Sequence, residues 1–125
     1  MRRPWNHLKK AVEALEPDPG DDALHQVRIR AKRARYAAEA AAPVVGKPAR
    51  AFARAAADLQ TVLGDHQDAV VAEEWLRREG SRGPAVALAA GQLIARQQVD
   101  AATTRERWPS MWKRASAKKL RAWFN

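Results

Sequence analysis

A row of basic side chains between residues 22 and 42 is the feature of this sequence best suited to chemistry. At about 100° per residue, one sector of a helix over this stretch holds side chains one turn apart: His25, Arg28, Lys32, Arg35, Tyr36 and Glu39. Like charges about 5 to 6 Å apart repel, so the row lowers helix stability unless an anion neutralises it. A linear polyanion is the ligand that such a row fits best.

The neighbouring sector of the same helix is apolar and is expected to pack: Leu24, Val27, Ala31, Ala34, Ala38 and Val45. Arg30 and Arg33 lie on other sides of this helix and are expected to be more exposed to solvent than the basic residues of the row. Arg33 is still a candidate binding residue. The alternative interpretation is that the cations only cover an Ala-rich helix and point into water. Five cations at positions 28–35, against one acid a turn later, favour binding.

Helices must position this row, because the apolar residues recur at helical spacing and no stretch alternates with period two. Proline and glycine give the stop signals, at 17–20, 43 with 46, 80–84 and 109. Asp21 and Asp22 supply an N-cap signal, and Gly64 is a candidate kink. The expected helices cover about 5–15, 22–42, 48–79, 85–107 and, as a short tail, 110–123.

The connections between these segments are short, which favours antiparallel neighbours. The predicted fold class is all-α: an antiparallel bundle or hairpin with two or three long helices plus short N- and C-terminal helices. The 28 alanines indicate that the helices approach closely. A chain of 125 residues suits a single domain over 1–125.

Composition and charge narrow the class of partner. Without cysteine there is no disulfide framework and no thiolate metal site. The net charge of +9 is uneven: residues 1–20 carry +1, 21–54 +5, 55–104 −3 and 105–125 +6. Such a balance predicts an anionic partner. No apolar run approaches the roughly 18 residues of a membrane span, and the N-terminus is not that of a signal peptide, so a cytoplasmic location is expected.

Two motifs resemble those of the CHAD domain, the conserved-histidine α-helical domain. Residues 24–39, LHQVRIRAKRARYAAE, resemble its His-x-x-Arg, basic pairs and Arg-Tyr-x-x-Glu signature. Residues 59–68, LQTVLGDHQD, resemble its second motif, Leu-Gln-x-x-Leu-Gly-x-x-x-Asp with a histidine. The resemblance extends from the helix at Trp5 to the aromatic ending, and its form is that of the C-terminal half of the domain.

The resemblance implies an all-helical domain of two pseudo-symmetric halves around a basic surface that binds inorganic polyphosphate. The resemblance implies that His25 is one of the conserved histidines for which the family is named. The alternative is that His25 only forms a local hydrogen bond at the start of its helix. A full domain is about twice this length, so the chain is expected to be a fragment, a split gene or a half that pairs with itself. A homodimer could replace the missing repeat. This function implies that the protein is located at polyphosphate granules in the cytoplasm.

Catalysis and metal binding find little support. His66 and Asp68 superficially suggest a metal dyad, but the histidines lack zinc-helix spacing and a carboxylate cluster. No Glu-x-Glu-x-Lys motif of a CYTH triphosphatase, no P-loop and no nucleophile with its base occur. We therefore expect a binding module, not an enzyme, with no cofactor. His66 lies on an apolar helix face, either as a satisfied core residue or as an auxiliary that orients Arg28 or Lys32.

The basic tail leaves a second function open. Aromatics among bases can stack on nucleobases, which makes nucleic acid the main alternative partner. The competing interpretation is that Trp108, Met111 and Trp112 anchor the tail to the bundle. Four cations would then form an auxiliary patch: Lys113, Arg114, Lys118 and Lys119. A third alternative is a regulatory half-module that needs a partner repeat or a CYTH triphosphatase.

Overall fold

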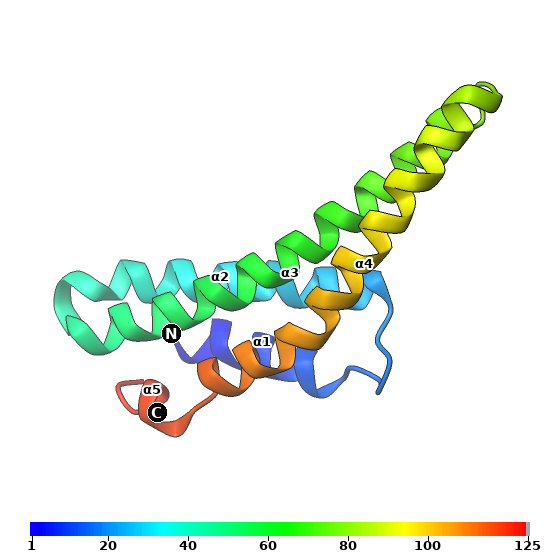
Figure 1. Cartoon of the computed structure of the whole chain (residues 1–125). Helices are drawn as coiled ribbons and strands as arrows, with labels where there is room; N and C mark the ends of the chain where they lie inside the picture. Colours follow the sequence, from blue (N-terminus) through cyan, green and yellow to red (C-terminus); the bar gives the residue numbers. More distant parts are fainter. Residues whose placement is uncertain (125) are drawn as a thin grey trace.

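Five α-helices make up the regular structure of residues 1–124, which are the residues that the computed structural model describes (Figure 1). They are α1 (Arg2–Glu13), α2 (Asp21–Val45), α3 (Lys47–Gly80), α4 (Pro84–Ala115) and α5 (Lys118–Arg121). No strand occurs in that part of the chain. The all-α fold class is confirmed.

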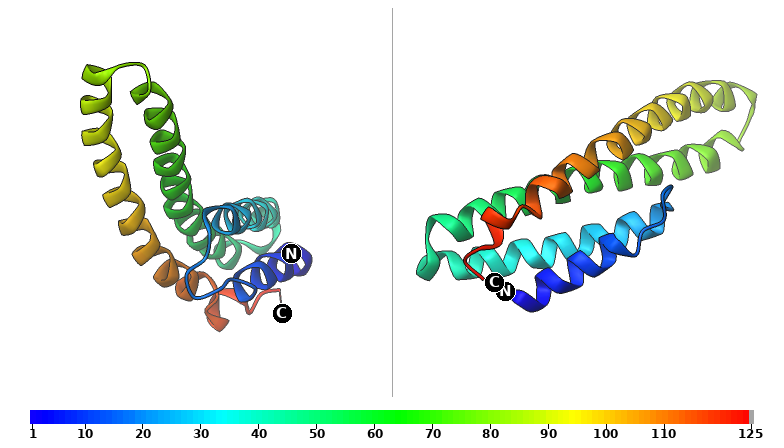
Figure 2. Two further views of the ribbon diagram at one scale, coloured as in Figure 1. Left: turned by 90° about the vertical axis from the view of Figure 1, so that its right-hand side faces the viewer. Right: turned by 90° about the horizontal axis from the view of Figure 1, so that it is seen from below.

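The long helices α2, α3 and α4 run back and forth, as the short connections predict (Figures 1 and 2). α3 packs against α2 with its first half and against α4 along much of its length. The far part of the α3–α4 hairpin extends beyond α1 and α2 as an arm (Figure 2). We call the rest of the molecule the base: α1, α2, the first half of α3, the last part of α4 and α5. There α1 packs on α2, and the two chain ends lie close together (Figure 2). The Arg2 Nε donates to the Phe124 carbonyl at 2.9 Å.

The hydrophobic core lies where α1, α2 and the first half of α3 meet. Its alanines Ala31, Ala34 and Ala38 are fully buried, so the backbones of α2 and α3 approach closely. Aromatic rings close the base, with Trp5 stacked on Trp112 at a centroid distance of 5.4 Å. The packing sector predicted for α2 is confirmed except at Val45, which is 36% exposed at the end of the helix.

Two prolines that were expected to end helices lie inside them. α2 continues past Pro43 to Val45, and α4 continues past Pro109 to Ala115. An internal proline removes one backbone hydrogen bond and costs about 3 kcal/mol. For α4, burial of Trp108 and Trp112 against the core offsets that cost. The predicted end of the fourth helix near 107 is therefore wrong, and so is the tail helix over 110–123, since α5 spans four residues only.

The expected N-cap of α2 is also wrong. Gly20, not an aspartate, is the N-cap of α2, and no side chain caps it. Asp21 lies in the first turn and accepts hydrogen bonds from side chains of other helices. α3 remains helical through Gly64, which lies against the Arg28 side chain in the α2–α3 contact, and a kink at this residue stays a prediction.

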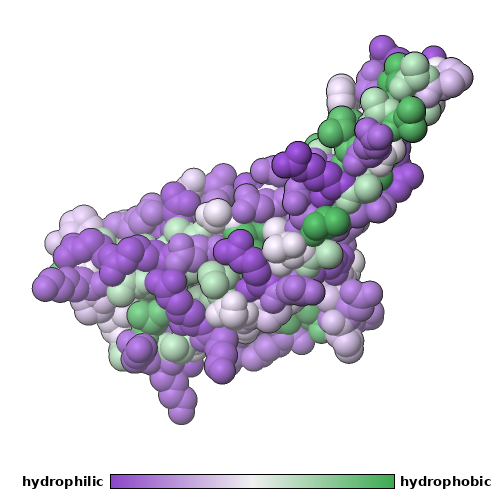
Figure 3. All heavy atoms as spheres, viewed as in Figure 1, coloured by the Kyte–Doolittle hydropathy of each residue, from purple (hydrophilic) through white to green (hydrophobic). Residues whose placement is uncertain are grey.

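The surface differs between base and arm. Hydrophilic residues cover most of the base in the view of Figure 3, whereas hydrophobic residues lie among hydrophilic ones on the arm. The exposed apolar residues of the arm are Val71, Trp75, Val86, Leu88, Leu93 and Val99. No helix within residues 1–124 has the length and apolar character that crossing a bilayer requires.

Candidate functional site

The basic row of α2 lies along the seam between α2 and α3. Arg28 runs beside Gly64 of α3, so closely that a Cβ at Gly64 would lie 3.1 Å from the Arg28 Nε. Two turns along, the Arg35 Nη1 donates to the Gln60 Oε1 at 2.9 Å. Both contacts fix the direction of an arginine side chain. We call the surface formed by His25, Arg28, Lys32, Arg35 and Tyr36 the α2 row.

Two atoms of the α2 row are buried without a hydrogen-bond partner in the described part of the chain, the His25 Nδ1 and the Arg28 Nε. Neither Arg28 nor Lys32 forms an ion pair there, and Lys32 is exposed. Buried polar atoms usually find partners, and an unpaired one carries the cost of its desolvation. The first half of the row is therefore positively charged and unneutralised.

The second half of the row is partly neutralised by its own helix. The Arg35 Nε lies 2.8 Å from a carboxylate oxygen of Glu39, one turn away. The Tyr36 ring lies 5.1 Å from the Arg35 guanidinium and 5.7 Å from the Lys32 ammonium, within cation–π distance. An anion bound here competes with Glu39 for Arg35, whereas Arg28 and Lys32 are free to bind it.

Two arginines of α3 extend this surface, and the sequence analysis missed them. Arg50 and Arg54 line a hollow beside Glu39 at the α2–α3 seam. Arg54 also lines the next hollow, together with Lys113, Arg114 and Lys119. The signal for them in the sequence is the net charge of +5 over residues 21–54, because Arg50 and Arg54 are one turn apart at the start of α3.

The tail residues divide between packing and charge. Trp108, Met111 and Trp112 pack against the core cluster, which confirms that they anchor the tail. The Arg114 Nη1 pairs with the Asp58 Oδ2 at 2.6 Å, while Lys113 and Lys119 line the hollow beside Arg54 without an ion pair in residues 1–124. Lys118 is exposed.

Arg33 is not brought to the α2 row. Together with Arg30 it lies on the side of α2 that faces α1, where both line a hollow with His7. The remaining candidates of the sequence analysis, from His25 to Tyr36, share the other flank of the helix.

His66 is a buried residue with partners on two helices. Its Nδ1 lies 2.9 Å from the Thr104 hydroxyl of α4, and its Nε2 lies 2.8 Å from the Asp21 carboxylate of α2. Asp21 also accepts from the Arg105 Nη2 at 2.7 Å. Burial alone would raise the pKa of Asp21, but the hydrogen bonds from His66 and Arg105 outweigh it and hold this pKa below its usual value. His66 thus joins three helices and bonds to no residue of the α2 row.

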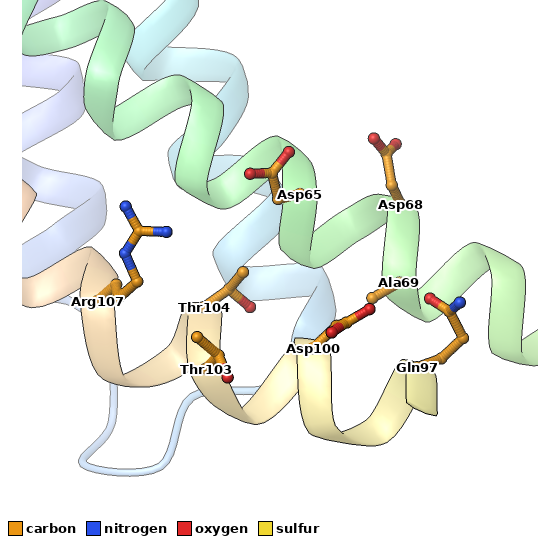
Figure 4. Close-up of a pocket in the computed structure, with 8 residues that line it drawn as sticks. All are labelled: Asp65, Asp68, Ala69, Gln97, Asp100, Thr103, Thr104 and Arg107. Atoms are coloured by element: carbon orange, nitrogen blue, oxygen red, sulfur yellow. The ribbon is translucent and has the colours of Figure 1, made fainter. Parts of the chain in front are cut away.

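Asp68, the other half of the suspected metal dyad, points elsewhere. It lines a hollow between α3 and α4 with Asp65, Asp100, Thr103 and Arg107 (Figure 4), and it shares no hydrogen bond with His66. Within residues 1–124, no three His, Asp or Glu side chains converge as metal ligands. The hollow is acidic, in contrast to the surface along α2.

Comparison with known proteins places the chain in a family. The CHAD domain family matches residues 1–77, which include both motifs and the α2 row. Two curated proteins of Mycobacterium tuberculosis, uncharacterized protein MT2285 (strain CDC 1551 / Oshkosh) and uncharacterized protein Rv2226 (strain H37Rv), are 40% identical over 77 residues. That stretch is 61% of this chain and 14% of each relative. The search of solved structures found no significant match.

The chain therefore belongs to the CHAD domain family, whose members are polyphosphate-related modules and generally non-catalytic binding domains. The match ends near the end of α3, so it is shorter than the resemblance noted in the sequence, which extended to the aromatic ending. α4 and the tail lie outside it. The α2 row and both arginines that extend it on α3 lie within the matched part.

Proposed function

We propose that this chain binds inorganic polyphosphate along the α2 row and is not an enzyme. The observation that carries the proposal is the unneutralised pair Arg28 and Lys32. Arg28 lies at the α2–α3 seam, and its Nε, like the nearby His25 Nδ1, is buried without a hydrogen-bond partner in residues 1–124. Arg50 and Arg54 continue the same seam beyond Glu39. Membership of a polyphosphate-related family supports the same ligand.

Spacing gives the preference for a chain over a single phosphate. The planar guanidinium of Arg28 can bind two oxygens of one phosphate, while Lys32 acts as a movable point charge. From His25 to Arg35 the row extends roughly 15 Å, at about 1.5 Å per residue. A monophosphate meets one or two cations, whereas each further contact of a chain is an intramolecular event.

Nucleic acid is the weaker candidate, because the tail tryptophans that favoured it pack against other aromatic rings. Base stacking needs exposed aromatic rings. In this chain Trp112 stacks on Trp5 instead, and Trp123 contacts the rings of Phe52 and Phe124. Polyphosphate granules in the cytoplasm are the location that this proposal implies, and a homodimer that replaces a missing repeat is proposed beside it. A regulatory half-module that needs a partner repeat or a CYTH triphosphatase is the third candidate.

Calorimetric titration with orthophosphate, triphosphate and long-chain polyphosphate tests the proposal. We expect polyphosphate to bind far more tightly than orthophosphate, with log K falling against log salt at about −0.7 per phosphate contact, as for other single-stranded polyanions. Arg28→Glu or Lys32→Glu should weaken polyphosphate binding by about tenfold or more, since a charge-assisted hydrogen bond contributes about 1.5 to 3 kcal/mol.

Arg96→Glu is the matched control, because Arg96 is exposed on the arm and forms no ion pair within residues 1–124. Arg77 is less suitable, since it pairs with Glu73 at 2.8 Å. Equal losses at Arg28, Lys32 and Arg96 would mean that net charge alone drives binding. Tighter binding of RNA than of polyphosphate at equal phosphate concentration would favour the nucleic-acid alternative.

A further inference from the structure

We infer that the groove between α1 and α2 is a second anion site, separate from the α2 row, that takes a short chain of linked phosphates such as a triphosphate group. Nothing in the proposed function requires it. The site stands on residues that the α2 row does not use, and it faces a different side of α2.

The groove brings together basic residues from two helices. Arg3, His7 and Lys10 lie three to four positions apart and so share one face of α1. Arg30 and Arg33 face them from α2, and two adjoining hollows share His7 with both arginines. The pairing depends on burial of Trp5 and Leu8, which seats α1 on α2. Residues far apart in the sequence thus form one basic cluster.

No carboxylate lines either hollow. Within residues 1–124, none of the five basic residues forms an ion pair, and the guanidinium of Arg30 bonds only to neutral oxygens of Gln26, at 2.9 and 3.3 Å. The hollow at the α2–α3 seam, by comparison, includes Glu39. A concave surface lined by one sign of charge concentrates ions of the opposite sign.

The dimensions of the cluster favour a short ligand. From Arg3 to Lys10 is seven residues of helix, roughly 10 Å, with the two arginines of α2 opposite. Several cations can therefore converge on one compact, highly charged anion. No aromatic side chain other than the His7 imidazole lines the groove, so it offers little to stack on a nucleobase. The phosphate chain itself is the part that the groove recognises.

The test uses inorganic triphosphate, with the Lys32→Glu variant as the starting protein so that the α2 row is weakened. We expect the groove of this variant to bind triphosphate with the same affinity as the groove of the unmodified chain. Adding Arg33→Glu should weaken triphosphate binding by about tenfold. His7→Glu should produce a similar loss from the other helix. Both positions are exposed or line the surface, so the fold is retained, and circular dichroism verifies it.

Arg96→Glu in the same background is the control and should leave triphosphate binding unchanged. ATP is the second probe, because it carries a triphosphate group on a nucleoside. Similar affinities for ATP and inorganic triphosphate mean that the groove recognises the phosphates only. Tenfold tighter binding of ATP would overturn this assignment. Equal losses at Arg33 and Arg96 would also overturn the site. The outcome is independent of the α2 row, because long-chain polyphosphate binding is measured separately with Lys32→Glu against the unmodified chain.

Discussion

Asp21 is the residue at which three helices are tied together. It accepts from the buried His66 of α3 and from Arg105 of α4, while it belongs to the first turn of α2. Arg105 also donates to the Pro19 carbonyl at 2.6 Å, which holds the loop before α2. A negative charge near a helix N-terminus is favoured by the helix dipole as well. The contact positions the start of α2, and hence His25, relative to α3.

The charge of Asp21 makes this contact dependent on pH. Its pKa in the folded protein lies below the usual 3.8, so its stabilising contribution is fully present above that value and is lost as pH falls through the folded pKa. Asp21→Asn should reduce the free energy of unfolding at pH 7 by about 1 kcal/mol, a modest figure because the carboxylate is half exposed. The difference from the unmodified protein should shrink below about pH 3.8, as denaturant titrations at several pH values would reveal.

Asp22→Asn is the matched control, since Asp22 is exposed and its carboxylate forms no hydrogen bond within the described residues. It should leave the pH profile unchanged. Identical profiles for both variants would contradict the role given to Asp21.

At this scale the sequence predicts which side chains share a face but not which partners they meet. The α2 row follows from periodicity alone, because Arg28 and Lys32 are one turn apart on one helix. The partner of His66 lies 45 residues away, and the helix that carries Thr104 is 38 residues away in the other direction. Only tertiary packing brings such residues together, and the same holds for Arg33 and His7.

At the scale of the element, the seam between α2 and α3 depends on a glycine. Gly64 is in mid-helix, where glycine costs about 1 kcal/mol relative to alanine. Its lack of a side chain leaves room for Arg28, whose Nε would lie 3.1 Å from an added Cβ. Gly64→Ala should therefore retain or slightly raise the free energy of unfolding while it displaces Arg28 and weakens polyphosphate binding several-fold. Urea denaturation and calorimetry measure the two effects.

Gly91→Ala provides the control for this prediction. Gly91 also lies inside a helix, α4, and nothing stands within 4 Å of an added Cβ. It should gain about 1 kcal/mol in stability with no change in binding. If both alanine variants bound polyphosphate equally well, the position of Arg28 against Gly64 would not matter for the ligand.

Helix ends were harder to predict than helices, for a reason visible at Pro109. Local propensity ends a helix before proline, but the apolar side chains on either side of it pack onto the core and keep α4 continuous. The free energy gained by burying two tryptophan side chains is of the same order as the cost of the hydrogen bond lost at Pro109. Tertiary packing therefore decides where α4 ends. Residues 81–83 are exposed or half-buried and carry no apolar side chain, and there the expected turn between α3 and α4 is found.

For the whole molecule, charge and exposed apolar surface divide along the length of the fold. Residues 55–104, which include the arm, carry a net −3, and the rest of the chain carries +12. The arm itself, residues 71–99, is close to neutral, with four arginines and three glutamates, and its exposed apolar residues include Leu88 at 71% exposure. The acidic hollow with Asp65, Asp68 and Asp100 lies between α3 and α4 (Figure 4). Exposed apolar side chains gathered on one part of a molecule are typical of an interaction surface, and they support the proposed homodimer.

The homodimer leads to a prediction about mass in solution. Size-exclusion chromatography with light scattering should give twice the chain mass of 13.9 kDa at micromolar concentration. Leu88→Glu should shift the protein towards the monomer, because a carboxylate in a buried contact loses its hydration. Val44→Glu makes the same change at a residue that is 92% exposed in the last turn of α2, at the opposite end of the molecule from the tip of the arm (Figure 1), and should leave the mass unchanged. Pairing through the arm would be contradicted if the unmodified chain were monomeric, or if both variants dissociated equally. The α2 row of a single copy would then bind polyphosphate alone.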